Sequence, residues 1–187
     1  MKQLSTLKQY AKDHHVPIIS DDGLLFLQQV IESHRIKRVL EIGTAIGYSA
    51  LFMVGLGCHV TTIERDPIMV AEARKHLGKV KEVTLIEADA LIYDGPLATY
   101  DLIFIDGAKA QYQRFFEKYT PFLAPGGLVI CDNLHFHHLK PEEVNRHTKQ
   151  LLRKIARFKT YLQEITSFST TFYDVGDGMS ISKKVKP

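Results

Sequence analysis

The chain has 187 residues, of which 45% are hydrophobic and 24% charged, and its formal net charge is +3. This length fits one globular domain, and so small a net charge does not by itself indicate a nucleic-acid-binding protein. The apolar runs span only a few residues, and the first ten residues have no apolar centre. These features argue against a membrane span and a secretory signal, and they predict a cytoplasmic protein. The two cysteines lie in apolar stretches, which favours buried thiols over a disulfide.

The first 36 residues predict a helical preface to the main fold. Apolar residues recur at helical spacing from Leu4 to Ala11, and Ser20 or Asp21 is suited to cap a second helix. No repeat or low-complexity linker divides the chain. We therefore expect residues 1–187 to form one domain, with residues 37–187 as its core.

From residue 37 onward, short β-branched apolar runs alternate with amphipathic stretches. The runs have the composition of strands buried on both faces, and they cover residues 38–42, 59–63, 83–87, 100–106 and 127–132. Helical segments are predicted over residues 49–56, 67–77 and 111–123. Such alternation predicts a parallel sheet with helices on both faces. Residues 172–175 and 179–182 flank a Gly-Asp-Gly turn, which predicts one antiparallel hairpin at the end of the sheet.

The loop after the first predicted strand has the features of a cofactor site. It runs from Glu41 through Gly43 and Thr44 to Ser49, where a helix begins. In an open α/β sheet, glycine at this position lets a ligand approach the backbone, and the helix N-terminus favours negative charge. The loop lacks the further glycines of a dinucleotide fingerprint, which argues against NAD. With Ser49 available to hold a carboxylate, it suits a cofactor with an amino-acid end, such as S-adenosylmethionine.

Acidic residues also follow the second and third predicted strands. Glu64 is placed to accept hydrogen bonds from both ribose hydroxyls of a cofactor, and Asp89 with Ala90 lies where an adenine should fall. Taken singly, each acid is more often a solvated turn residue. The ordered set on successive strand ends predicts a nucleoside-type cofactor.

The fourth and fifth predicted strands end in oxygen-bearing side chains: Asp106, and Asp132 with Asn133. Two carboxylates and an amide suit Mg²⁺ or another hard divalent cation rather than Zn²⁺. Such a cation would bind two adjacent oxygens of a substrate and lower the pKa of the reacting hydroxyl. Lys109, three residues after Asp106, is a candidate general base, and a surface lysine is the simpler alternative. We expect Asp106 and Lys109 to be the catalytic pair.

Histidine and aromatic side chains are further candidates for the substrate end of the site. His135, His137 and His138 complete no tetrahedral metal site by their spacing, so we interpret them as loop residues near the substrate. A substrate base would need an aromatic side chain to stack on, and Tyr48 and Tyr112 are candidates together with Phe136. The sequence does not choose among them.

The positive charge is concentrated in one segment. Residues 140–160 hold seven Lys and Arg against two Glu, whereas the rest of the chain holds 17 against 19. At 100° per residue, four of these cations share one side of a helix and the apolar residues occupy the other; they are Arg146, Lys149, Arg153 and Arg157. A solvated helix face is the simpler interpretation. An RNA-binding ridge that neutralises about four phosphates would give a log-log salt slope of roughly −3 to −4.

The motifs together resemble the metal-dependent class I O-methyltransferases, which include the catechol and caffeoyl-CoA enzymes. The resemblance covers nearly the whole chain and is carried in family order by LEIGTAIGYSA, TIERD, EADA, LIFIDGAKAQYQRFF, GGLVICDN and VGDGMSISKK. Within the family, HHVPI, GTAIGYSA, AKAQYQRFF and VGDG are most similar to the bacterial subgroup that converts 5-hydroxyuridine in tRNA to 5-methoxyuridine.

This resemblance implies a Rossmann-like methyltransferase fold of seven strands in the order 3-2-1-4-5-7-6, with strand 7 antiparallel, and a homodimer. It also implies a metal site at Asp106, Asp132 and Asn133. The implied cofactor contacts are Ile19, Ser49, Glu64, Asp89, Ala90 and Asp106.

Three functions therefore stand as alternatives. The first is a Mg²⁺- and S-adenosylmethionine-dependent O-methyltransferase of 5-hydroxyuridine in the tRNA anticodon loop, whose 5-hydroxyl and O4 oxygen are adjacent as in a catechol. The second is the same chemistry on a small catechol-like or caffeoyl-CoA-like vicinal diol. The third is a nucleotide- or RNA-binding module without catalysis. An NAD-dependent oxidoreductase fits less well, because the loop lacks the dinucleotide pattern.

Overall fold

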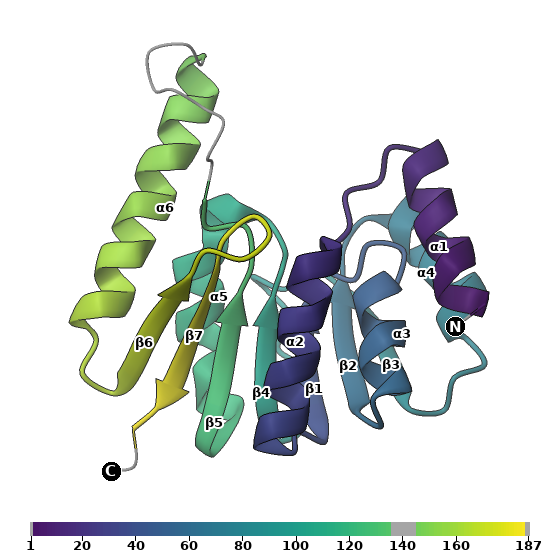
Figure 1. Cartoon of the computed structure of the whole chain (residues 1–187), viewed down its shortest axis with the longest axis horizontal. Helices are drawn as coiled ribbons and strands as arrows, with labels where there is room; N and C mark the ends of the chain where they lie inside the picture. Colours follow the sequence, from purple (N-terminus) through teal and green to yellow (C-terminus); the bar gives the residue numbers. More distant parts are fainter. Residues whose placement is uncertain (1, 136–144, 186–187) are drawn as a thin grey trace.

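The computed structural model describes residues 2–135 and 145–185, which form one seven-stranded sheet with helices on both faces (Figure 1). The strands are β1 (Arg38–Ile42), β2 (His59–Glu64), β3 (Val83–Glu87), β4 (Tyr100–Ile105), β5 (Leu123–Cys131), β6 (Phe168–Tyr173) and β7 (Met179–Lys184). The helices are α1 (Lys2–Asp13), α2 (Asp21–His34), α3 (Tyr48–Gly55), α4 (Pro67–Leu77), α5 (Tyr112–Tyr119) and α6 (Arg146–Glu164), with short 3₁₀ turns η1 (Lys109–Gln111) and η2 (Thr120–Phe122).

The strand order is β3-β2-β1-β4-β5-β7-β6, which confirms the predicted Rossmann-like topology. Strands β1 to β5 pair in parallel, so their carboxyl ends share one edge of the sheet. Strand β7 runs antiparallel to both of its neighbours, β5 and β6, as predicted. In a sheet of this kind, ligands bind beyond the carboxyl ends of the strands.

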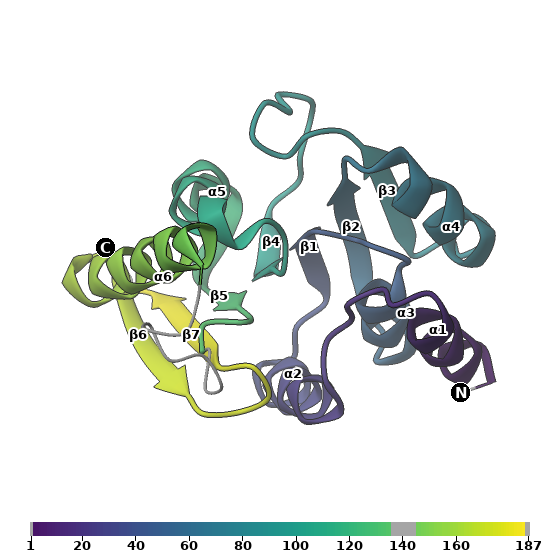
Figure 2. The ribbon, with the colours of Figure 1, turned by 90° about the horizontal axis from the view of Figure 1, so that it is seen from above.

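Two hydrophobic clusters hold the helices against the two faces of the sheet. Successive strand residues alternate between them, because side chains along a strand point to opposite faces: Val39 belongs to the first cluster and Leu40 to the second. The first cluster includes side chains from α1, α2, α3 and α4, and the second includes side chains from α5 and α6 (Figure 2). The prediction of helices on both faces is confirmed.

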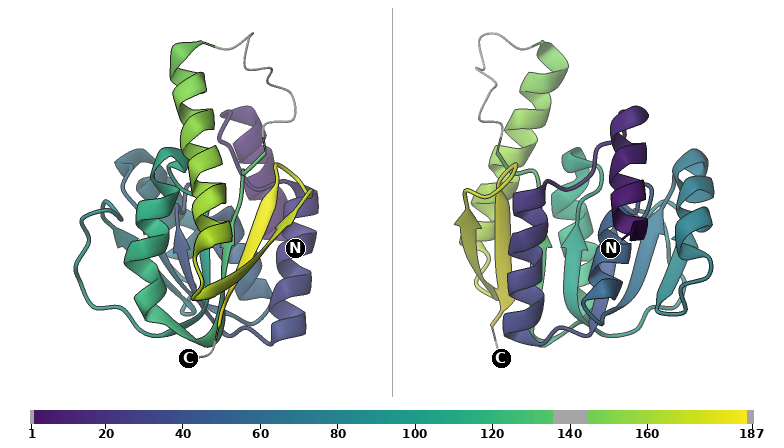
Figure 3. Two further views of the ribbon diagram at one scale, coloured as in Figure 1. Left: turned by 90° about the vertical axis from the view of Figure 1, so that its left-hand side faces the viewer. Right: turned by 45° about the vertical axis from the view of Figure 1, so that its right-hand side comes forward.

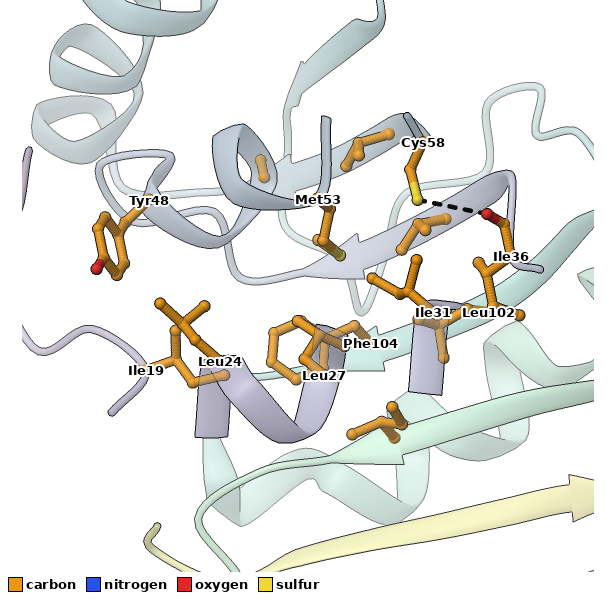
Figure 4. Packing of buried hydrophobic residues seen from close by; sticks show 14 of the residues in the cluster. Ile19, Leu24, Leu27, Ile31, Ile36, Tyr48, Met53, Cys58, Leu102 and Phe104 are labelled. Atoms are coloured by element: carbon orange, nitrogen blue, oxygen red, sulfur yellow. Dashed lines mark hydrogen bonds between the residues drawn. The ribbon is translucent and has the colours of Figure 1, made fainter. Parts of the chain in front are cut away.

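The two cysteines lie in different clusters. Cys58 is buried in the first cluster, where its thiol donates a hydrogen bond to the carbonyl of Ile36 at 3.6 Å (Figure 4). Cys131 is buried in the second cluster. Both thiols are free, and the sheet separates them.

The helical preface forms as predicted and connects to the main fold by specific contacts. Ser20 caps α2, since its hydroxyl accepts a hydrogen bond from the backbone N–H of Gly23 at 3.1 Å. Lys8 of α1 pairs with Asp21 at the start of α2 at 2.6 Å. Both partners are exposed, so this pair orients the two helices more than it stabilises them.

Three predicted boundaries differ from the structure by more than two residues. Strand β6 begins at Phe168 rather than at residue 172, because it pairs with β7 along its whole length. Strand β5 begins at Leu123, which pairs with Tyr100 ahead of an irregularity in the register with β4. The helix predicted over residues 111–123 ends at Tyr119, and Pro121 lies in the 3₁₀ turn that follows.

Candidate active site

A cavity of about 570 Å³ lies at the carboxyl ends of the parallel strands. Its wall includes the loops that follow β1, β2, β3 and β4, the segment before α2, and the turn between β6 and β7. Eight of the nine residues predicted to bind a cofactor line it: Ile19, Gly43, Thr44, Ser49, Glu64, Asp89, Ala90 and Asp106. The ninth, Glu41, does not line the cavity.

The loop after β1 needs glycine at position 43 because of its backbone conformation and the closeness of a neighbouring backbone segment. Gly43 has a φ of +100°, and a Cβ there would lie 2.6 Å from the backbone carbonyl oxygen of Asp106. That oxygen belongs to backbone and cannot turn aside as the end of a side chain can. The absence of a side chain at Gly43 therefore lets the β1 loop and the end of β4 come close together.

Glu41 lies beneath the loop in a buried hydroxyl network. Its two carboxylate oxygens accept hydrogen bonds from the hydroxyls of Ser49 at 2.5 Å and Thr62 at 2.6 Å. The hydroxyls of Thr62 and Thr44 are also paired, at 2.5 Å. Burial raises the pKa of Glu41 to about 7, although both hydroxyls favour its ionised form. The structure thus places Glu41 as a support for Thr44 and Ser49, which face the cavity.

The acids at the end of β2 and after β3 are held by backbone donors. The Glu64 carboxylate accepts from the N–H groups of Ala45 at 3.0 Å and of Arg65 and Asp66 at 2.9 Å. Asp89 accepts from the N–H of Leu91 at 2.8 Å, and its other oxygen lies 3.4 Å from the Arg65 guanidinium. These contacts fix both carboxylates at the rim of the cavity.

The three predicted metal ligands lie together. The Asn133 amide donates to Asp106 Oδ1 at 2.9 Å, and the Asn133 backbone N–H donates to Asp132 Oδ1 at 2.7 Å. Asn133 has a φ of +59°, a left-handed conformation that asparagine tolerates better than most residues. Lys109 joins the group, because its ammonium donates to Asn133 Oδ1 at 2.7 Å. We call Asp106, Lys109, Asp132 and Asn133 the acidic cluster below.

Crowding and burial disfavour negative charge in the acidic cluster. Burial, and then the charge of Asp132, raise the pKa of Asp106 well above its usual range. Burial also raises the pKa of Asp132 to about 6, and the charge of Asp177 adds to this effect. Lys109 opposes the shift at both acids. One lysine and one asparagine thus serve a partly buried carboxylate, that of Asp106, and a buried one, that of Asp132.

The donor set of the acidic cluster fits a hard cation better than a soft one. In residues 2–135 and 145–185, no group of three or more His, Cys, Asp and Glu side chains is arranged to hold a metal ion. The cluster has two carboxylates, and its third donor is the amide oxygen of Asn133. Carboxylate and amide oxygens are ligands that Mg²⁺ and Ca²⁺ prefer, whereas Zn²⁺ sites favour His and Cys.

Several parts of the cavity wall were not predicted from the sequence, including two that come from near the two ends of the chain. One is the segment from Val16 to Ile18. In this part of the chain only Ile19, the next residue, was predicted to bind the cofactor. The other is Asp177, in the turn between β6 and β7. The Gly-Asp-Gly pattern around Asp177 signals a tight turn, but the pairing of β7 with β5 is needed to bring that turn to the cavity.

The aromatic and histidine candidates have different outcomes. Tyr48 lines the cavity. Tyr112 was a wrong candidate for stacking on a substrate, because its ring is buried against Phe158 and its hydroxyl donates to the backbone carbonyl of Asp132 at 3.0 Å. The Nδ1 atom of His135 lies 3.3 Å from Oδ1 of Asp174. Phe136, His137 and His138 lie outside the described residues.

The basic ridge predicted on the last helix is exposed. Arg146, Lys149, Arg153 and Arg157 of α6 all face solvent, while Ile155, Phe158 and Leu162 are buried on the opposite side. The N-terminal turns of α6 rise past the carboxyl ends of the strands (Figures 1 and 3). Within the described parts of the chain, no ion pair involves these four cations. In the same parts, no helix, α6 included, is both long and apolar enough to cross a bilayer.

Comparisons with known proteins show the family to which the chain is similar. A model of a family described as O-methyltransferase matches residues 1–185. A solved Staphylococcus aureus protein assigned to the caffeoyl-CoA O-methyltransferases is 36% identical, with a TM-score of 0.89 over 97% of this chain and 91% of that chain. The catechol O-methyltransferase of Niastella koreensis is 29% identical over 58% of this chain and 54% of that protein.

One further solved structure bears on the fold alone. The SAH-bound methyltransferase PaMTH1 of Podospora anserina is 23% identical, with a TM-score of 0.84 over 98% of this chain and 88% of that chain. Because the family model spans almost all of the chain, an enzyme is favoured over a non-catalytic binding module and over an NAD-dependent oxidoreductase. The chain belongs to the O-methyltransferase family.

Proposed function

We propose that this O-methyltransferase uses S-adenosylmethionine and a divalent cation, with Mg²⁺ the first choice, to methylate the 5-hydroxyl of 5-hydroxyuridine in a tRNA anticodon loop. Its product is 5-methoxyuridine. The cavity and its rim support the donor, the acidic cluster supports the cation, and the exposed ridge on α6 supports the RNA. A homodimer is also expected from the family resemblance, and sedimentation of the purified chain tests it.

The cavity offers suitable partners along the length of the donor. Thr44 and Ser49 line the cavity near the start of α3, where the helix N-terminus suits the carboxylate of the methionine end. Glu64 suits the ribose hydroxyls, because its carboxylate is already oriented by backbone donors. Asp89 is held by Leu91 at the rim, where it suits the adenine amino group. A solved fold relative, PaMTH1, binds SAH, the product form of this donor.

The acidic cluster supports the cation. Asp106 and Asn133 face the cavity, and Asp132 is buried behind them. These residues would hold the ion, since their oxygens form a hard donor set with an excess of negative charge. When bound, such an ion polarises the acceptor oxygens and favours the ionised hydroxyl.

Lys109 is the proposed general base. Its ammonium lies 2.7 Å from Asn133 Oδ1, and its side chain lines the cavity. From this position its neutral amine form accepts the proton of the acceptor hydroxyl as the methyl group moves from the sulfonium sulfur to the hydroxyl oxygen. The transfer converts the sulfonium to a thioether and the hydroxyl to a methyl ether, so the released proton is the one that Lys109 takes up.

The basic ridge on α6 is the main observation in favour of an RNA substrate. Its four cations are exposed, and the N-terminal turns of α6 extend past the carboxyl ends of the strands, the edge of the sheet at which the cavity lies. A free catechol or thioester diol spans too few atoms to reach four aligned side chains, whereas an RNA stem presents phosphates at regular intervals. An unpaired anticodon base is also cheap to unstack into a cavity.

A small vicinal diol is the second candidate substrate. The assignment of the S. aureus structure and the activity named for the N. koreensis relative favour it. Both candidates present two adjacent oxygens to the acidic cluster. They differ in their need for the ridge, and that difference makes them separable by experiment.

The decisive experiment measures tRNA nucleosides by mass spectrometry in cells that lack this protein. The proposal predicts accumulation of 5-hydroxyuridine and loss of 5-methoxyuridine, restored by the wild-type chain. Unchanged 5-methoxyuridine would overturn the tRNA substrate and leave the small diol.

A matched experiment in solution tests the ridge. The triple variant Arg146→Ala, Arg153→Ala, Arg157→Ala should raise KM for tRNA and reduce the magnitude of the log-log salt slope by roughly 2 to 3. The control variant Lys12→Ala, Lys79→Ala, Lys81→Ala removes the same charge from exposed positions off the ridge. Equal losses in both variants would show a general charge effect and not an RNA-binding ridge.

A further inference from the structure

We propose that Asp177 determines acceptor specificity: its carboxylate accepts a hydrogen bond from the N3–H group of the uracil ring. This inference rests on the proposed function and deepens it. Asp177 lines the same cavity as Asp106, Lys109 and Asn133, but it comes from the turn between β6 and β7 rather than from the β4 or β5 loop.

The turn is attached to the segment that carries Asn133. The backbone N–H of Leu134 donates to the carbonyl of Gly178 at 2.9 Å, and the N–H of His135 donates to the carbonyl of Asp177 at 2.8 Å. Two consecutive residues after Asn133 therefore pair with the turn. Asp177 and Asn133 keep a fixed relation, because they sit on two bonded backbone segments.

Both glycines that flank Asp177 lie close to side chains of other segments. Gly178 has a φ of +83°, and a Cβ there would lie 2.3 Å from the His135 ring. Gly176 has a φ of +55°, and a Cβ there would lie 2.5 Å from the hydroxyl of Ser20, which caps α2. The turn is thus wedged between the β5 loop and α2, and in this Gly-Asp-Gly triplet only Asp177 carries a side chain.

The Asp177 carboxylate is available to a ligand. Across residues 2–135 and 145–185, it forms no ion pair and its oxygens accept no hydrogen bond. Its charge acts on Asp132, which agrees with a position close to the acidic cluster. A negative acceptor beside the two carboxylates of the acidic cluster favours a substrate that brings a hydrogen-bond donor.

The chemistry of the substrate supplies that donor. In 5-hydroxyuridine, the reacting 5-hydroxyl and O4 are adjacent, and N3–H is the next group along the ring edge. With the two oxygens directed at Asp106 and Asn133, N3–H follows on the same edge of the base, where a carboxylate can accept from it. A catechol has a C–H group at this place, and 5-hydroxycytidine has an acceptor nitrogen that a carboxylate repels. Asp177 would therefore favour hydroxyuridine over both.

The test compares two RNA hairpins that differ only at N3, one with 5-hydroxyuridine and one with 3-methyl-5-hydroxyuridine. The wild-type enzyme should methylate the N3-methylated hairpin about 10- to 100-fold less efficiently in kcat/KM. Asp177→Ala should lose about the same factor on the unmodified hairpin, and its preference between the two hairpins should collapse. Asp94→Ala, at an exposed acid outside the cavity, is the charge-matched control and should keep the full preference.

Several outcomes would overturn the inference. An Asp177→Ala enzyme that still prefers the unmodified hairpin by the wild-type factor would show that Asp177 does not read N3. Loss of S-adenosylmethionine affinity in calorimetry, or a shifted Mg²⁺ requirement, would show a structural or metal-binding role. Failure of the wild-type enzyme to methylate the 5-hydroxyuridine hairpin would instead reject the proposed function itself.

Discussion

The two halves of the cavity treat their acidic groups differently. In the half built on β1, β2 and β3, the carboxylates of Glu41 and Glu64 accept hydrogen bonds from hydroxyls or backbone N–H groups. In the half built on β4 and β5, Asp106 and Asp132 share one amide and one lysine. The first half is organised without a ligand, whereas the described residues of the second half set one cation, Lys109, against two carboxylates. We infer that the first half is preformed for binding and that the second is built for chemistry.

The largest effect on this comparison is expected from Asp132→Asn, which keeps the side-chain shape and removes one charge from the second half. Turnover in the presence of Mg²⁺ should fall by about 100- to 1000-fold, because bound-ion chemistry supplies several kcal/mol. S-Adenosylmethionine affinity, measured by calorimetry, should be largely unchanged. A parallel loss of donor affinity would show that the two halves are not separate in function.

The same variant should be more stable than the wild type when no divalent cation is present. Burial raises the pKa of Asp132 from its ordinary value to about 6, so the folded state binds the proton more tightly than the unfolded state. Stability is then lost as pH rises from about 4 to 6, and the Asn variant avoids that loss. Melting curves at pH 4 and pH 8 check this, with stabilisation expected only at the higher pH.

Lys109→Ala should reduce turnover by about 100-fold, the lower end of the usual range for loss of a general base. The loss should shrink as pH rises, since hydroxide can then replace the base. Lys109→Arg keeps the charge but cannot accept the proton near neutral pH, so it should not restore the rate. If the Arg variant is fully active, charge rather than proton transfer is the contribution of Lys109.

Gly43→Ala tests the contact between the two halves. Its Cβ would lie 2.6 Å from the Asp106 carbonyl oxygen, so a destabilisation of about 2 kcal/mol or more is expected in urea unfolding. Gly126→Ala is the matched control: Gly126 also has a positive φ, at +73°, but nothing lies within 4 Å of the added carbon. It should cost only about 1 kcal/mol, from backbone strain alone. Equal losses would mean that the close approach is unimportant.

The smallest effect is expected from Glu41→Gln. Burial raises the pKa of Glu41 from 4.5 to about 7, so the wild type loses stability as pH rises through that interval. The Gln variant should show a shallower fall, by at most one proton or about 1.4 kcal/mol per pH unit. Urea unfolding at several pH values measures the slope, and Glu82→Gln, at an exposed position, serves as the reference.

The fold was predictable because its strands are short, apolar and separated by helices. The boundary of β6 was not, since Ser169 and Thr171 are exposed edge-strand residues without a strong apolar alternation. Pairing with β7, and not local sequence, determines where this strand begins.

Within the site, residues that follow strands were predictable because parallel strands bring their ends together. Asp106, Asp132 and Asn133 meet for this reason. The support of Glu41 by Thr62 depends on the register that places them side by side in β1 and β2. Asp177 depends on a strand that returns from the far end of the chain. Neither the register between β1 and β2 nor the pairing of β7 with β5 can be obtained from the spacing of residues in the sequence.

The close approach at Gly43 has a consequence for how the enzyme must evolve. The loop that we propose binds the donor packs directly against the backbone of Asp106, a proposed ligand on the acceptor side. The relative position of these two backbone segments is thus set when the chain folds. New acceptors are then more easily recruited by remodelling the outer turns and α6 than by moving the reacting centre.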